Sequence, residues 1–117
     1  MSEPRVERRR APRTEVLGEL TVSIDGSPVG ARVREISEGG FALETDAAPP
    51  TGVQRFTLQF GSLDPVEIVA ESVHATRVSL PGAAPVFLAG FEFLPCSAGT
   101  AARLTALVEG IARRCAA

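Results

Sequence analysis

Four arginines lie close together near the amino terminus of a chain that is acidic overall. Arg8, Arg9, Arg10 and Arg13 fall within "RRRAPR", whereas the 117 residues together carry a formal net charge of −2. A guanidinium group presents a planar fork of N–H donors that matches phosphate oxygens and the O6/N7 edge of guanine. Arg9 and Arg13 are four positions apart, which is roughly 13 Å in an extended chain. That separation suits a grip on opposite sides of a compact anion, although a solvated basic tail has the same composition.

A second polar group occurs further along, in "EISEGG" between two strand-like runs. Glu35 supplies a carboxylate, Ser37 a hydroxyl, and Gly39 and Gly40 a stretch of backbone that a ligand can approach closely. Taken alone, such a segment is typical of a tight turn. It becomes informative only in combination with the arginines.

The sequence contains no group of residues that indicates catalysis or metal binding. His74 is the only histidine and has no Ser or Cys partner near it in sequence, so we interpret it as an ordinary strand residue. Cys96 and Cys115 form no CxxC motif, and we expect both to pack as small apolar side chains. We therefore expect a protein that is not an enzyme and has no cofactor or metal.

Apolar residues alternate with polar ones through most of the chain, which predicts β-strands. Turn signals rich in Gly, Pro and Asp separate the alternating segments. The predicted strands cover residues 15–24, 31–36, 41–46, 53–60, 66–79 and 86–94. Six strands separated by short turns predict a small antiparallel barrel or sandwich.

Only the last part of the chain has helical periodicity. Apolar residues recur at helical spacing over residues 97–115, with Ser97 as the expected N-cap and Arg113 and Arg114 near the carboxyl end. A single apolar stripe predicts that this helix packs on the barrel. We therefore expect residues 1–14 to form an extended arm, because Pro12 disfavours helix there, and residues 15–117 to form the barrel domain with its helix.

Length and composition allow one domain with a proper core, since 44% of the residues are hydrophobic. The first 15 residues are charged and lack the apolar stretch of a signal peptide. No apolar run approaches the length of a membrane span. We expect a cytoplasmic protein without membrane insertion.

The two motifs in this order resemble the signature of the PilZ family of bacterial cyclic di-GMP receptors. "RRAPR" (Arg9 to Arg13) matches the family's RxxxR motif, and "EISEGG" matches [DN]xSxxG at Ser37 and Gly40. "LAGFEFL" is a weaker likeness to the last strand of the family. The resemblance covers residues 7–113 and implies a six-stranded antiparallel β-barrel, of the split-barrel type, with a carboxy-terminal helix.

The resemblance also implies a ligand and the residues that bind it. Arg9 and Arg13 would clamp phosphate and guanine, Ser37 would donate a hydrogen bond, and Gly39 and Gly40 would allow close approach of the backbone. Arg8 and Arg10 would steer the anion or contact a second ligand molecule. Ordering of the arm by cyclic di-GMP would then create a surface for a protein partner in motility or exopolysaccharide control.

One position departs from the family motif, and two alternatives to cyclic di-GMP binding stay open. Glu35 stands where the family has Asp or Asn, and its extra methylene moves the carboxylate by about 1.5 Å. The first alternative is a degenerate PilZ domain that binds only protein. The second is a barrel that binds RNA or DNA through the arginines, which the negative net charge and the lack of clearly exposed aromatic residues disfavour. We expect no DNA or RNA partner, and a monomer or weak homodimer.

Overall fold

The computed structural model describes residues 19–116, with side chains to residue 114. The predicted arm, with Arg8, Arg9, Arg10 and Arg13, lies outside the described residues, as does the start of the first predicted strand. The remaining strands are β1 (Leu20–Ile24), β2 (Ala31–Ile36), β3 (Gly40–Thr45), β4 (Val53–Phe60), β5 (Val66–Val78) and β6 (Val86–Phe93). A helix, α3 (Ala98–Ala116), follows them. The predicted fold class, six strands with a carboxy-terminal helix, is confirmed.

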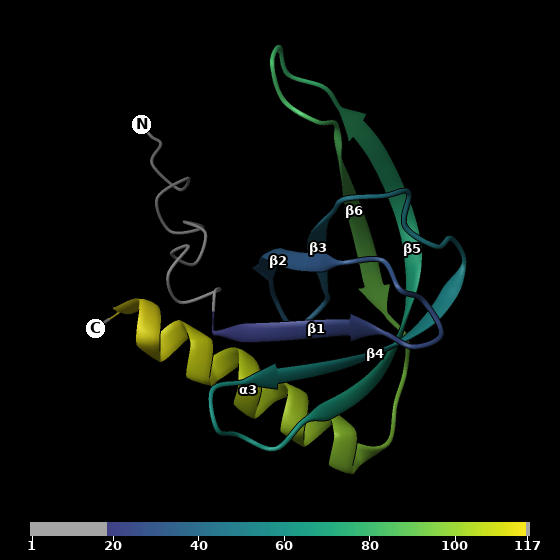
Figure 1. Cartoon of the computed structure of the whole chain (residues 1–117). Coiled ribbons are helices and arrows are strands. Elements are labelled where there is room, and N and C mark those ends of the chain that lie inside the picture. The colour runs from purple at the N-terminus through teal and green to yellow at the C-terminus, as the bar shows by residue number, and fades with distance from the viewer. Residues whose placement is uncertain (1–18, 117) are drawn as a thin grey trace, which may run out of the picture.

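The six strands form one antiparallel sheet that curls into a nearly closed barrel (Figure 1). Their order is β1-β4-β5-β6-β3-β2, so β1 and β2 are the two edges of the sheet. These edges contact one another, which brings the barrel close to closure. The order of the strands in the sheet differs from their order in the chain, and β3 therefore lies beside β6.

Alternate side chains of every strand fill the barrel, as the period of two predicts. Phe56 is at the centre, and its ring meets Phe41 and Phe91 in edge-to-face contacts with centroid separations of 4.9 Å each. Contacts of this kind add to the stabilisation from burial alone. Leu43, Leu58 and the other inward residues complete the core.

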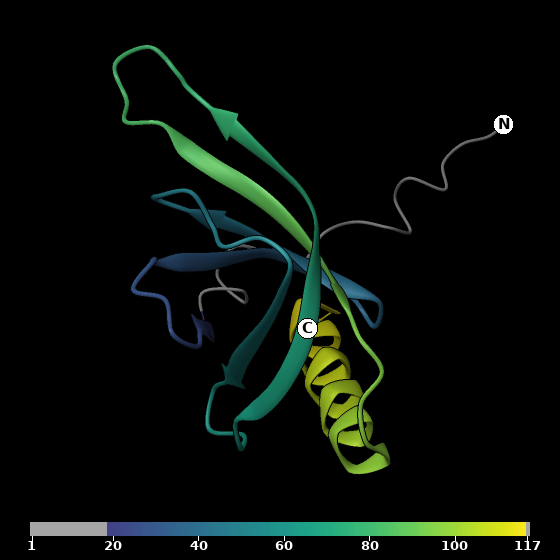
Figure 2. The ribbon, with the colours of Figure 1, turned by 90° about the vertical axis from the view of Figure 1, so that its right-hand side faces the viewer.

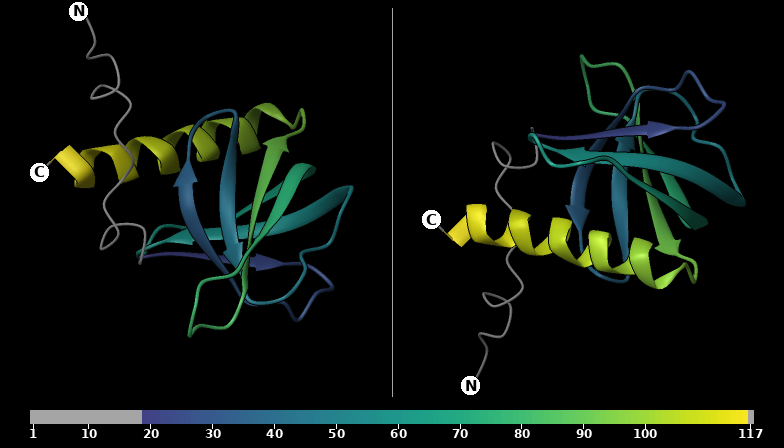
Figure 3. Two further views of the ribbon diagram at one scale, coloured as in Figure 1. Left: turned by 90° about the horizontal axis from the view of Figure 1, so that it is seen from above. Right: turned by 90° about the horizontal axis from the view of Figure 1, so that it is seen from below.

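Helix α3 lies across one end of the barrel (Figure 3). The Ser97 hydroxyl accepts a hydrogen bond from the Thr100 backbone N–H at 3.1 Å, as expected of an N-cap. Leu104, Leu107 and Ile111 on the apolar stripe are buried in the core. At the other end of the helix, Arg114 forms a bidentate ion pair with Glu19 just before β1, with Nη1 2.7 Å from Oε1.

Strand β5 bends part-way along, at a β-bulge between Ser72 and His74. Residues 70 and 71 pair with both β4 and β6, whereas residues 74–78 pair only with β6. The β5–β6 hairpin consequently extends beyond the barrel (Figure 2). Over the described part of the chain, no helix is long and apolar enough to cross a membrane.

Candidate functional site

The segment "EISEGG" forms the turn between β2 and β3. The Ser37 backbone N–H donates to the Gly40 carbonyl oxygen at 2.9 Å, which closes the turn. The Ser37 hydroxyl accepts from the Gly39 N–H at 3.3 Å and lies 3.5 Å from the Gly40 carbonyl oxygen. Both hydroxyl contacts are long and Ser37 is exposed, so this hydroxyl can exchange them for a ligand.

At Gly40 this turn lies directly against the neighbouring strand β6. A Cβ at Gly40 would lie 2.2 Å from the backbone oxygen of Phe91 on β6, a separation that real Cβ atoms do not show. The Gly39 carbonyl oxygen accepts from the Phe93 N–H at 3.0 Å, which fixes the turn against the same strand. A Cβ at Gly39, in contrast, would meet no atom within 4 Å. Glycine is therefore required by packing at position 40 and not at position 39.

Glu35 faces outward because of a β-bulge in β2. Val33 pairs with Leu43 and Glu35 pairs with Ala42, so Arg34 is an extra residue between them. Without the bulge, strict alternation from buried Val33 would turn Glu35 toward the core. The Glu35 side chain is exposed on the outer face of the barrel, two residues before Ser37.

The bulge also places Arg34 beside Glu35 on the outer face. The charge of Arg34 is neutralised by an ion pair with Glu44. Glu44 on β3 accepts from Arg32 Nη2 at 2.8 Å and from Arg34 Nη1 at 2.7 Å. Arg32 also donates to Asp46 at 3.1 Å. The hydrogen bond from Arg32, followed by that from Arg34, holds the pKa of Glu44 below its usual value.

The structure thus brings Glu35, Ser37, Gly39 and Gly40 together at one end of the β2–β3 hairpin. Their grouping follows directly from the turn between two strands. Arg8, Arg9, Arg10 and Arg13 lie outside the described residues, and their position relative to the turn stays a prediction. Arg32 and Arg34 are charges near the turn that were not predicted as part of the site. The sequence does indicate them, because in "RVREISE" two outward-facing arginines directly precede the motif.

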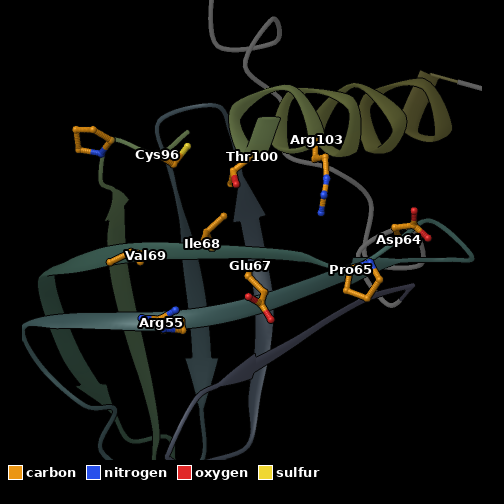
Figure 4. A pocket seen from close by; sticks show the side chains of 10 residues that line it. Arg55, Asp64, Pro65, Glu67, Ile68, Val69, Cys96, Thr100 and Arg103 are labelled. Carbon is orange, nitrogen blue, oxygen red and sulfur yellow. The ribbon is translucent and has the colours of Figure 1, made fainter. Parts of the chain in front are cut away.

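A separate groove of about 710 Å³ lies between α3 and the strands β4 and β5 (Figure 4). Arg103 extends from the helix toward the strands, and Arg55 lies on β4 (Figure 4). Asp64 and Glu67 line the same groove, so opposite charges balance and a dianion gains little there. None of the described site residues lines it.

Cys96 lines this groove and is exposed. The expectation that it packs as a small apolar side chain is wrong, because the chain between β6 and α3 runs over the surface at this point. The side chain of Cys115 lies outside those described. Within the described residues, no group of three or more His, Cys, Asp or Glu side chains could hold a metal ion.

Comparison with known proteins identifies the family and agrees with the fold. The family model described as the PilZ domain matches residues 7–110, which is most of the chain and includes both motifs. Comparison with curated proteins and with solved structures gives no match. PilZ domains are regulatory binding modules, and their family binds cyclic di-GMP. By the extent of the family match and by its barrel, helix and β2–β3 turn, the chain belongs to the PilZ domain family.

Proposed function

We propose that this protein binds cyclic di-GMP at the β2–β3 turn and transmits the binding to a protein partner. The observation that carries the proposal is the Ser37–Gly40 turn, in which an exposed hydroxyl and a closely packed glycine lie beside an outward carboxylate. Membership of a family that binds this nucleotide supports the ligand class. The proposal places the protein among adaptors of motility or exopolysaccharide control in the cytoplasm.

The arginines of the arm would complete the site. Six residue steps separate Arg13 from Glu19, where the described structure begins, so the connecting chain can span up to roughly 20 Å. Arg9 and Arg13 would bind phosphate and the guanine O6/N7 edge as bidentate donors. Arg8 and Arg10 would add to the attraction of the dianion. An arm ordered by ligand in this way would offer a partner a surface that is absent before binding.

Glu35 decides between this proposal and its main alternative. Its carboxylate is exposed and points away from the core, so it can accept from the N1–H and N2–H donors of a guanine. The extra methylene relative to the family motif would displace the base rather than remove its acceptor. The degenerate PilZ domain, which binds only protein, is the interpretation to adopt if this displacement proves too large.

Titration calorimetry with cyclic di-GMP tests the proposal on the wild type and on Arg13→Ala. We expect binding by the wild type and a loss of about tenfold or more in Arg13→Ala, since hydrogen bonds to charged groups contribute about 1.5–3 kcal/mol. The matched control is Arg77→Ala, which removes an exposed arginine from the β5–β6 hairpin. Arg77 pairs with Phe87, so its side chain lies on the face opposite to that of His74 and Thr76. The control should bind as the wild type does.

The variant Glu35→Asp separates the two alternatives. No heat from the wild type, with binding restored in Glu35→Asp, would support the degenerate domain and refute the proposal. Binding to random oligonucleotides that weakens steeply with salt, without preference for cyclic di-GMP, would instead indicate a nucleic-acid partner.

A further inference from the structure

The register of the sheet places four residues in one row across the outer face, starting at Glu35. Glu35 on β2 pairs with Ala42 on β3, Ala42 pairs with Gly90 on β6, and Gly90 pairs with His74 on β5. Adjacent strands are about 4.8 Å apart, so the row runs roughly 14 Å from Glu35 to His74. Its two central residues, Ala42 and Gly90, have little or no side chain, so a ring from a neighbouring strand can lie close over this part of the sheet.

His74 ends this row with its ring folded over the neighbouring strand. A Cβ at Gly90 would lie 2.5 Å from His74 Cε1 and 2.9 Å from Nδ1, so the imidazole occupies the space that a side chain at position 90 would need. Gly90 is buried, whereas His74 remains exposed. One part of the ring therefore covers Gly90 while the rest is open to a ligand on the outer face.

The neighbouring row indicates which part of a nucleotide fits here. Gly40 pairs with Glu92 on β6, and Glu92 pairs with Glu71 on β5, so two carboxylates flank the row on the side of the Ser37 turn. Carboxylates repel a phosphate but accept hydrogen bonds from the N–H groups of a purine. The face beside His74 is thus suited to a base rather than to the phosphates.

We infer that His74 stacks on one guanine of the ligand and so extends the binding site from the β2–β3 turn to the β5–β6 hairpin. The inference rests on the proposed function, because it concerns the same ligand. Aromatic rings, histidine included, bind bases through their flat faces. His74 would thereby couple the projecting hairpin to ligand binding.

Magnetic resonance tests the contact directly, because His74 is the only histidine of the chain. Its ring Cε1–H signal can be identified by its absence from His74→Ala. Saturating cyclic di-GMP should shift this signal upfield in the wild type through the ring current of the stacked purine. Calorimetry on the same proteins should give binding weakened about tenfold in His74→Ala and largely retained in His74→Phe, which keeps a flat ring. Thr76→Ala, an exposed residue of the same strand and face, should bind like the wild type.

The outcomes separate this inference from the proposed function. Wild-type binding with an unmoved histidine signal would overturn the inference and leave the proposed function intact, whatever the affinity of His74→Ala. A shifted signal with full affinity in His74→Ala would also overturn it, since the ring would then contribute nothing to binding. If the wild type gives no heat, the proposed function fails and the inference falls with it.

Discussion

At Gly40 the turn has no room for a side chain. The φ of Gly40 is not positive, so its importance does not come from a left-handed conformation. It comes from the Phe91 carbonyl oxygen, which occupies the space of a side chain. The "GG" of the motif therefore has one glycine required by packing and one whose Cβ position is open.

Replacing each glycine in turn should separate these two cases. Gly40→Ala forces β3 away from β6, and we expect a loss of about 2–3 kcal/mol in the free energy of unfolding, the magnitude typical of overpacking. Gly39→Ala meets no atom within 4 Å and should stay within about 0.5 kcal/mol of the wild type. Urea unfolding of the two variants measures the difference. Equal stabilities would contradict the close approach at Gly40.

Glu44 should make a pH-dependent contribution to stability. Hydrogen bonds from Arg32 and Arg34 lower its pKa in the folded state, so the ionised carboxylate stabilises the fold. That contribution is present above the unfolded-state pKa, near 4.5, and is lost as the pH falls through the lower folded-state pKa. The arginines are half exposed or more, and we expect the contribution to be at most about 1 kcal/mol.

The measurement is the difference in unfolding free energy between the wild type and Glu44→Gln across pH. The wild type should be the more stable protein at pH 7, and the difference should shrink below about pH 4. Glu109→Gln, on the exposed side of α3, serves as the control. If the difference in unfolding free energy grew as the pH fell, the pKa of Glu44 would not be lowered in the folded state.

At the scale of the elements, the sequence predicts the strands and the helix, because the spacing of apolar residues within each segment determines them. Alternation in "VQRFTLQF" gives β4 as Val53–Phe60, and the stripe of Leu104, Leu107 and Ile111 gives a helix that packs on the barrel. Both predictions rest on the burial of one face of the element, and the spacing of the apolar residues indicates which face that is. The position of the β2–β3 turn is predictable for the same reason, because "SEGG" falls between two alternating runs.

What the sequence could not predict depends on contacts between strands distant in the chain. The bulges at Arg34 and Val73 change which residues face outward, and no local pattern marks them. The row from Glu35 to His74 requires that β3 pair with β6, which the order of the sheet determines. The sequence alone predicts an ordinary strand residue at His74, because its neighbour Gly90 is known only once the strands are paired.

Helix α3 should contribute to stability through its buried stripe. Leu107 is 1% exposed in the core, and Leu107→Ala should cost about 2–5 kcal/mol through lost burial and the cavity left behind. Thr105→Ala changes an exposed residue two positions earlier and should alter stability by less than about 0.5 kcal/mol. Thermal unfolding of both variants measures the contrast. A small effect of Leu107→Ala would mean that the helix is not part of the cooperative fold.

For the molecule as a whole, the proposed function assigns separable tasks to the barrel and to the amino-terminal arginines. The core involves residues from Leu20 to Ile111, and the helix is tied to the start of β1 through Arg114 and Glu19. The arginines of the RxxxR motif precede all of these residues in the chain. If the proposed function is right, changes in the arm should abolish binding without weakening the barrel.

Thermal unfolding of the double variant Arg9→Ala/Arg13→Ala, with and without cyclic di-GMP, tests this separation. Without ligand, the variant and the wild type should unfold at the same temperature, because the core of the described part of the chain is complete across all six strands and the helix. At about a hundredfold excess over its dissociation constant, ligand bound only to the folded state stabilises it by about 2.7 kcal/mol. For a domain of this size that corresponds to a rise of several degrees in the wild type, and none in the variant. A variant destabilised without ligand would show that the arginines support the fold itself, and the loss of binding could then no longer be assigned to the missing clamp.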